Sequence, residues 1–243
     1  MGKRIILFIL LCSFFIGISA QNAKLYDAYI SNQMDIWKTE MDRMEQDYLT
    51  EKNIDNLFDL TLAQYGYIAY CMSMDQKKMA TDYVEKAKQN AETMLEYDSK
   101  WARAHATRGA IYGFEAGQAP YKGIVLGTRA IREVEEAMVL DPVNPYIWME
   151  KGNIDLYKPT IFGGNKHDAI KFYLKAIELF EQDPGLTEKN WLYLNTLNGL
   201  ARAYVKTDRI KKANRTYLKI LELEPDFQWI RNDVYPKFLE KYF

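Results

Sequence analysis

The sequence predicts an all-helical protein, an α-solenoid of antiparallel helix pairs. Apolar residues recur at helical spacing along nearly the whole chain after residue 25, and no stretch shows the strict alternation of apolar and polar residues that is typical of a strand. A set of small and apolar residues then recurs at similar spacing in three successive segments, which indicates stacked repeats. The composition, 48% hydrophobic and 27% charged residues in a chain of 243, is that of a globular protein.

The first twenty residues have the composition of a secretory signal peptide. A basic start is followed by the apolar residues 5–18 and by the small residues Ser19 and Ala20. The apolar run is shorter than the ~18 residues that a membrane-spanning helix needs, which disfavours a retained anchor. We therefore expect an exported mature chain that starts at about Gln21, is periplasmic or secreted, and has no transmembrane segment.

Charge and cysteine content exclude two classes of protein. Without Lys3 and Arg4, which belong to the signal peptide, 30 of the 32 basic residues remain beside 33 acidic residues. No long basic stripe of the kind that binds nucleic acid stands out, so no nucleic-acid partner is expected. Cys71 is the only cysteine left in the mature chain, so an intramolecular disulfide cannot form even in an oxidising compartment. The fold must therefore be stabilised by packing.

Three helices are predicted before residue 98. An apolar stripe at helical spacing is formed by Trp37, Met41, Met44 and Tyr48. This stripe predicts one amphipathic helix over residues 26–49, which caps the N-terminal end of the fold. The next two helices are expected over residues 54–73 and 76–97 as an antiparallel pair, with Asp75 as the N-cap between them.

Six further helices are predicted between residues 100 and 223. Their expected ranges are 100–116, 121–140, 145–157, 166–180, 189–206 and 208–223. Asn144, Asn165 and Asp208 can act as N-caps, because their side chains can accept hydrogen bonds from the free amides at a helix start. Pro145 suits a first helical position, where its missing N–H needs no partner.

The C-terminal segment, residues 226–243, is expected to cover the last apolar face of the fold. Its pattern predicts a helix to about Tyr235. Pro236 lacks an amide hydrogen and crowds the preceding turn, so we expect the helix to break or kink there.

The repeated spacing is clearest in the last helix pair. It is formed there by Leu197, Leu200, Ala201, Tyr204, Ala213, Tyr217, Ile220 and Pro225. The preceding unit contains Trp148, Gly152, Leu156, Ala169, Tyr173 and Ala176, and the one before that contains Gly109, Tyr112, Ala130, Val134, Ala137 and Pro142. A fourth, degenerate unit contains Ala87, Ala91 and Met94. The repeat pairs are therefore expected at about 54–97, 100–142, 144–184 and 189–225.

This spacing resembles that of the tetratricopeptide repeat (TPR) family, which the last unit matches at nearly every defining position. The resemblance implies a right-handed superhelix with a concave groove lined by the first helices, and it implies a scaffold that binds proteins or peptides. Its physical basis is close packing, because small residues let two helices approach and bulky tyrosines fill the space between pairs. Residues 21–243 are accordingly expected to form a single TPR-like domain.

Two consecutive repeats carry extra residues between their first and second helices. The step between the equivalent tyrosine and alanine positions is nine residues in the last unit, but eighteen and fourteen in the two units before it. Because equivalent turns of stacked repeats lie on one edge, we expect residues 113–127 and 158–166 to be neighbours in space.

The second of these turns resembles a turn in exported bacterial TPR proteins, including accessory proteins of solute transporters. The matching residues are Pro159, Phe162, Gly163, Gly164, Ala169, Ile170, Tyr173 and Ala176. The resemblance implies an alternative function, the binding of a small molecule in a pocket between the two long turns. The residues themselves leave two interpretations open. The glycines and the helix start at Asn165, flanked by Lys158 and Lys166, can bind an anion, or the turn only reverses the chain.

No catalytic pattern is found in the sequence. His105 and His167 lie in different repeats and belong to no closely spaced set of metal ligands. We therefore expect a protein without enzymatic activity, metal or cofactor.

Several residues are candidates for binding a protein, a peptide or a small molecule. Trp101, Trp148 and Trp191 each open a first helix and can serve as exposed anchors, with packing between repeats as the alternative. Groove lining or packing is expected for His105 and Tyr112. The complete candidate set is Trp101, His105, Tyr112, Trp148, Lys158, Phe162, Gly163, Gly164, Asn165, Lys166 and Trp191.

Overall fold

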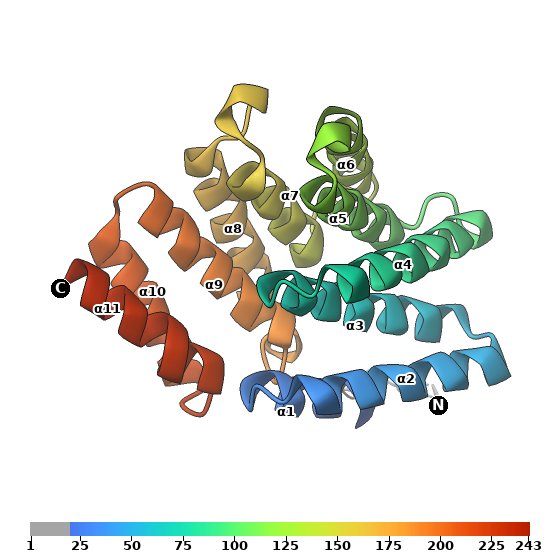
Figure 1. Ribbon diagram of the computed structural model, residues 1–243, viewed down its shortest axis with the longest axis horizontal. Coiled ribbons are helices and arrows are strands. Elements are labelled where there is room, and N and C mark those ends of the chain that lie inside the picture. Colours follow the sequence, from blue (N-terminus) through green and yellow to red (C-terminus); the bar gives the residue numbers. More distant parts are fainter. Residues whose placement is uncertain (1–19) are drawn as a thin grey trace, which may run out of the picture.

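The computed structural model describes residues 20–243, which form α-helices joined by short turns (Figure 1). No strand occurs in this range, so the predicted all-helical class is confirmed. None of the helices in it is both long and apolar enough to cross a membrane. The predicted signal peptide lies outside the described residues, except for Ala20.

Two N-terminal helices precede four helix pairs. The N-terminal helices are α1 (Ala20–Ile30) and α2 (Met34–Glu51). The pairs are α3 (Ile54–Ser73) with α4 (Lys77–Tyr97), α5 (Ala102–Gln118) with α6 (Gly123–Leu140), α7 (Pro145–Tyr157) with α8 (Lys166–Glu181), and α9 (Trp191–Lys206) with α10 (Ile210–Leu223). Single helical turns lie at η1 (Pro120–Lys122), η2 (Thr160–Phe162) and η3 (Pro184–Leu186). Each pair packs on the next, which is the solenoid arrangement that the sequence predicts. From α3 to α10, the observed helix ends lie within two residues of the predicted ends.

Small residues allow the two helices of a pair to approach closely. A Cβ added to Gly109 in α5 would lie 2.8 Å from Cγ2 of Val134 in α6. Tyr173 of α8 fills the space between pairs, because a Cβ on Gly152 would lie 2.9 Å from its ring, and one on Gly199 would lie 2.7 Å from it. These contacts agree with the packing role that the sequence pattern predicts for small residues.

Two of the four predicted N-caps are observed. The Asn144 side chain accepts from the amide of Tyr146 at the start of α7, and the Asn165 side chain accepts from two amides at the start of α8. The predictions for Asp75 and Asp208 are wrong. Both adopt left-handed backbone conformations, with φ of 55° and 57°. Each lies one residue before the N-cap position, which is held by Gln76 at α4 and by Arg209 at α10.

The N-terminal segment forms two helices instead of the single predicted one. The chain reverses after Ile30, where the Ser31 hydroxyl donates to the carbonyl oxygen of Asp27 and Asn32 adopts a positive φ of 56°. The apolar face of α2 packs on α3, whereas α1 packs on α2 and reaches α9. One straight helix could not reach both places.

The C-terminal helix continues through Pro236, so the predicted break does not occur. A π-helical turn, η4 (Ile230–Val234), leads directly into α11 (Tyr235–Tyr242). In this turn the amide of Tyr235 donates to the carbonyl of Ile230, five residues back. Proline is then the second residue of α11, where a missing amide hydrogen is tolerated.

The first helix joins the two ends of the helix stack. The Tyr26 hydroxyl donates to Oε2 of Glu224, which follows α10, at 2.5 Å. The ring centroid of Tyr29 lies 4.8 Å from that of Phe227, in the segment before η4. Figure 1 accordingly shows α1 at the end of α9, with the chain curving round from the first pair to the last. The N-terminal helices therefore pack against both the first and the last pair.

Candidate functional site

Aromatic side chains of the N-terminal helices pack against two of the first helices, α3 and α9. Trp191, at the start of α9, is only 8% exposed. Its ring centroid lies 5.2 Å from that of Trp37 in α2 and 6.3 Å from that of Tyr65 in α3. The Trp37 indole donates to the carbonyl of Ala63, and a Cβ on Gly66 would lie 2.7 Å from its ring. Trp191 therefore packs within the core and is not an exposed anchor.

Four residues on three of the first helices are linked by side-chain contacts. They are Phe114 in α5, Asn153 and Tyr157 in α7, and Arg202 in α9, and we call these four residues the groove strip. Tyr65 in α3 connects two of them: its ring lies 5.3 Å from that of Phe114, and its hydroxyl accepts from Nδ2 of Asn153 at 3.2 Å.

The C-terminal half of the groove strip is exposed to solvent. The Arg202 guanidinium lies 5.4 Å from the centre of the Tyr157 ring, a cation–π contact between α9 and α7. Both side chains are exposed, whereas Asn153 and Phe114 are half-buried. The strip thus offers two aromatic rings, a guanidinium and the remaining acceptor site of the Asn153 carbonyl to a partner.

A buried acid lies directly beneath the groove strip. Glu150 in α7 accepts from Nδ2 of Asn153 at 3.2 Å through Oε2, while its Oε1 has no hydrogen-bond partner among residues 20–243. Burial raises the pKa of Glu150 to about 7, against the opposing effect of hydrogen bonds from Asn153 and Tyr65. The Tyr173 hydroxyl donates to Oδ1 of Asn153 at 2.6 Å. This network holds the Asn153 amide in one orientation.

The long turn between α7 and α8 is built from contacts within the chain. Gly163 has a φ of +85°, and a Cβ on Gly164 would lie 1.9 Å from the carbonyl oxygen of Lys158, so both glycines are needed for the backbone path. The Lys166 ammonium donates to the carbonyls of Asp155 and Lys158, and burial lowers the pKa of Lys166. The Asn165 side chain occupies two of the amides at the start of α8. These contacts support the chain-reversal interpretation of the turn, and Phe162 remains exposed.

The other predicted candidates also make contacts between helices. The Trp101 ring lies 5.7 Å from that of Phe58, and the Trp148 indole donates to the carbonyl of Pro142. Tyr112 is buried in a small apolar cluster with Leu126 and Ala130. The three candidate tryptophans therefore face different neighbours and do not form one surface.

His105 belongs to an ion-paired group between α5 and α6. Its Nδ1 lies 2.7 Å from Oε2 of Glu133, and its Nε2 lies 3.0 Å from the carbonyl oxygen of Ser99. Arg108 also donates to Oε2 of Glu133, at 2.8 Å. Burial raises the pKa of Glu133, but the hydrogen bonds from His105 and Arg108 outweigh this effect and lower it. The histidine is thus held in a structural contact between the helices of one pair.

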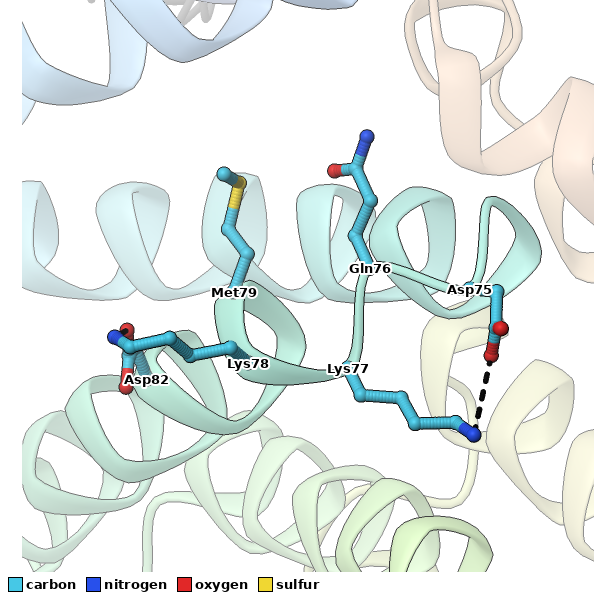
Figure 2. Close-up of a pocket in the computed structure, with 6 residues that line it drawn as sticks. All are labelled: Asp75, Gln76, Lys77, Lys78, Met79 and Asp82. Carbon is cyan, nitrogen blue, oxygen red and sulfur yellow. Dashed lines mark hydrogen bonds and ion pairs between the residues drawn. The ribbon is translucent and has the colours of Figure 1, made fainter.

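The two long turns lie along the same margin of the molecule in Figure 1. Their bases are close, because Leu126 near the start of α6 and Ile154 in α7 belong to the same apolar cluster. The hollow shown in Figure 2 is elsewhere, at the turn between α3 and α4. Its lining residues are Asp75, Gln76, Lys77, Lys78, Met79 and Asp82. A second hollow is lined by Glu92, Leu95, Glu96 and Arg108, so neither contains a residue of the two long turns.

The helix pairs together form an all-helical solenoid, and its last pair matches a known repeat family. The family model for the tetratricopeptide repeat matches residues 194–227, which span α9, α10 and the following loop. The last pair is thus a tetratricopeptide repeat, and the pairs before it stack in the same manner.

Two solved structures support this assignment of the fold. The chain is similar to a thermophilic TPR protein of Thermus thermophilus, with 15% identity, a TM-score of 0.61, and coverage of 91% of this chain and 100% of that one. It is also similar to the HusA haemophore from Porphyromonas gingivalis, with 14% identity, a TM-score of 0.57, and coverage of 79% and 97%. A comparison with curated protein sequences finds no match.

The members of the groove strip were not predicted as site residues. Asn153 and Arg202 each follow the small residue of a first helix, Gly152 or Ala201, so the two occupy equivalent repeat positions. Because equivalent positions of stacked repeats lie on the same face, this spacing could have predicted that the two residues share a surface. The contact of Phe114 with Tyr65 had no such signal, because it depends on how the first and second pairs stack.

Proposed function

We propose that this protein is an exported, non-enzymatic scaffold whose groove strip binds a protein or a peptide. The proposal depends chiefly on one observation: Trp191 is buried in the core, whereas Tyr157 and Arg202 of the groove strip are exposed and contact each other. Export is inferred from the signal-peptide composition of the first twenty residues. The TPR class supports a scaffold role, since such solenoids offer extended surfaces and no enclosed active site.

The chemistry of the groove strip suits a peptide segment. Arg202 can form a bidentate pair with a carboxylate, and the Phe114 and Tyr157 rings can bury an apolar side chain. Asn153 is already held by Tyr65, Glu150 and Tyr173, so little conformational entropy is lost when a partner binds it. We expect a partner that presents an acidic residue beside an apolar one.

Photo-cross-linking in the native cell tests this proposal. A photoreactive phenylalanine analogue replaces Tyr157, and the same analogue at the exposed Tyr97 is the matched control. A specific protein should be captured from position 157 and not from position 97. Its capture should fall when Arg202→Ala is added, and the purified partner should bind the unmodified protein more tightly than R202A. Identical capture from both positions, or capture that is insensitive to R202A, would contradict the role of the groove strip.

A small-molecule ligand is the second candidate function. Two observations favour it. The fold is similar to that of a haemophore, and two buried side-chain oxygens, Oε1 of Glu150 and Oδ1 of Asn198, have no hydrogen-bond partner in the part of the chain that the structure describes. A ligand with hydrogen-bond donors could satisfy them. The chain would then bind a small molecule outside the cytoplasm, as the resemblance to accessory proteins of solute transporters implies.

Thermal unfolding distinguishes the two candidates. Residues 21–243 are heated with haem, with small acids and with sugars, because a ligand of the folded state raises the melting temperature. The small-molecule function predicts a shift with one compound that is lost in Asn198→Leu. If no compound shifts the melting temperature while position 157 captures a protein, the small-molecule function is wrong.

A further inference from the structure

The two edges of the helix stack differ in charge. Within four residues of the turns inside the helix pairs there are nine basic and five acidic residues, in segments 70–80, 115–126, 154–169 and 203–213. Within four residues of the loops after each pair there are four basic and ten acidic residues, in segments 94–105, 137–148, 178–194 and 220–231. We call the first edge the turn edge and the second the loop edge. The turn edge is therefore basic in a chain whose total charge is −1.

Two acids of the turn edge are paired with lysines, two of which lie outside its segments. Glu115 faces the ammonium groups of Lys122 at 3.8 Å and Lys88 at 4.0 Å. Asp168 accepts from Lys171 and from Asn165. The basic side chains consequently dominate the electrostatic potential at this edge.

Successive turns of this edge contact each other. Nη2 of Arg209, before α10, lies 3.3 Å from Nδ1 of His167 in the first turn of α8. The start of α6 meets α7 through Leu126 and Ile154, as described above. In Figure 1 the turns between α5 and α6, α7 and α8, and α9 and α10 follow one margin. They form one surface made by three repeats, and the three segments of this surface contain seven basic and four acidic residues.

Exposed apolar side chains stand on the two long turns of this surface. Tyr121 and Ile161 are each 85% exposed. The other exposed apolar side chains of these turns, apart from Tyr157 of the groove strip, are Ile124, Val125 and Phe162. In each turn a lysine comes shortly before two consecutive apolar residues: Lys122 before Ile124 and Val125, and Lys158 before Ile161 and Phe162. The short turn between α9 and α10 has no exposed large apolar residue and is basic instead.

We propose that the turn edge docks on an anionic phospholipid bilayer. Ile124, Val125, Ile161 and Phe162 enter the boundary between headgroups and acyl chains, and Tyr121 lies at headgroup level. Lysine and arginine side chains of the same edge contact the lipid phosphates. This function is separate from partner binding at the groove strip, which uses a different set of residues.

The arrangement favours a bilayer over a protein as the occupant. The apolar residues stand on two separate turns, and fluid acyl chains can surround both of them, whereas a protein would need a matched surface for each. Segments that anchor a protein at a membrane surface often combine apolar residues with a nearby lysine. The aliphatic part of the lysine side chain packs on apolar groups while its ammonium group reaches the lipid phosphates. The glycine turn fixes the backbone that carries Ile161 and Phe162, so docking orders few groups.

Co-sedimentation with lipid vesicles tests the proposal. Residues 21–243 are used, because the apolar residues 5–18 would bind lipid on their own. We expect binding to vesicles of phosphatidylcholine mixed with phosphatidylglycerol, and weaker binding to phosphatidylcholine alone. Ile161→Ser with Phe162→Ser should weaken binding on the order of tenfold or more. Lys122→Glu with Lys158→Glu should also weaken it, and salt should reduce the remaining binding.

The matched control is Val139→Ser with Val143→Ser, two residues that are 78% and 69% exposed near the loop edge. This variant should bind the vesicles like the unmodified protein. Circular dichroism should show that all variants keep the helical fold, since the substituted side chains are exposed, apart from the half-buried Lys158. No binding to the anionic vesicles, or binding unchanged by I161S with F162S, would overturn the proposal. So would equal loss in the valine control, or capture of a protein partner at position 161 without vesicle binding.

Discussion

Trp37 and Trp191 lie edge to face in the core, with ring centroids 5.2 Å apart, although one belongs to α2 and the other to the last repeat. This contact connects the N-terminal helices to the end of the helix stack. Together with the bond between Tyr26 and Glu224, it holds Trp191 in the core, whereas Tyr157 and Arg202 of the groove strip are exposed. The same contact therefore determines both the stability of the fold and the position of the candidate site.

Truncation of Trp191 should strongly destabilise the protein. Trp191→Ala removes the ring that packs on Trp37, Tyr29 and Tyr65, so the free energy of unfolding should fall by ~3–5 kcal/mol. Urea unfolding followed by circular dichroism measures the change. Trp148→Ala is the control, and its loss should be smaller because that ring is half-buried. Equal losses would mean that the contact between the two ends contributes little.

The glycine turn should tolerate no side chain at its second glycine. Gly164→Ala places a Cβ against the carbonyl oxygen of Lys158, so the backbone must move, at a cost of ~1–3 kcal/mol in the free energy of unfolding. Gly127→Ala in α6 has open space and should stabilise the helix by ~0.5–1 kcal/mol. Thermal unfolding should thus shift in opposite directions for the two variants. A neutral G164A would show that the turn is less constrained than this geometry requires.

Glu150 should make the stability fall as pH rises. Its pKa is raised from 4.5 to about 7, so between these values the folded state keeps a proton that the unfolded chain has lost. The free energy of unfolding should therefore decrease by up to ~3 kcal/mol across this interval and level off above it. Glu150→Gln should remove the decrease, whereas Glu136→Gln at an exposed site should retain it. Urea unfolding at a series of pH values checks the slope, and a slope that persists in E150Q would assign it to other groups.

Capping residues should differ in importance according to their observed hydrogen bonds. Asn144→Ala removes the acceptor of the Tyr146 amide and should cost ~1 kcal/mol of stability. Gln76 holds the equivalent position before α4 but makes no side-chain cap bond, so Gln76→Ala should change the stability little. The urea concentrations at the unfolding midpoints of the two variants, each compared with the unmodified protein, measure the two effects. A larger effect at Gln76 than at Asn144 would contradict this account.

The helical fold was predictable because its signals are local. Helix periodicity and the caps Asn144 and Asn165 depend only on neighbours along the chain, and the observed ends of α3 to α10 lie within two residues of the prediction. Asp75 and Asp208 were misassigned because an aspartate suits both a cap and a left-handed turn. The continued helix at Pro236 depends on a shift to π-helical hydrogen bonding, which the proline alone does not reveal.

The candidate site depended on contacts between distant segments. The sequence alone determined the helices, the repeat spacing and the position of the two long turns, because each is set by the order of side chains along one or two helices. Only the tertiary structure determined that α1 folds back onto the last repeat and that Trp191 is buried in the core. It also determined that Asn153 and Arg202 both belong to the groove strip. Those outcomes depend on the curvature of the stacked pairs, which results from packing between many side chains and has no local signal.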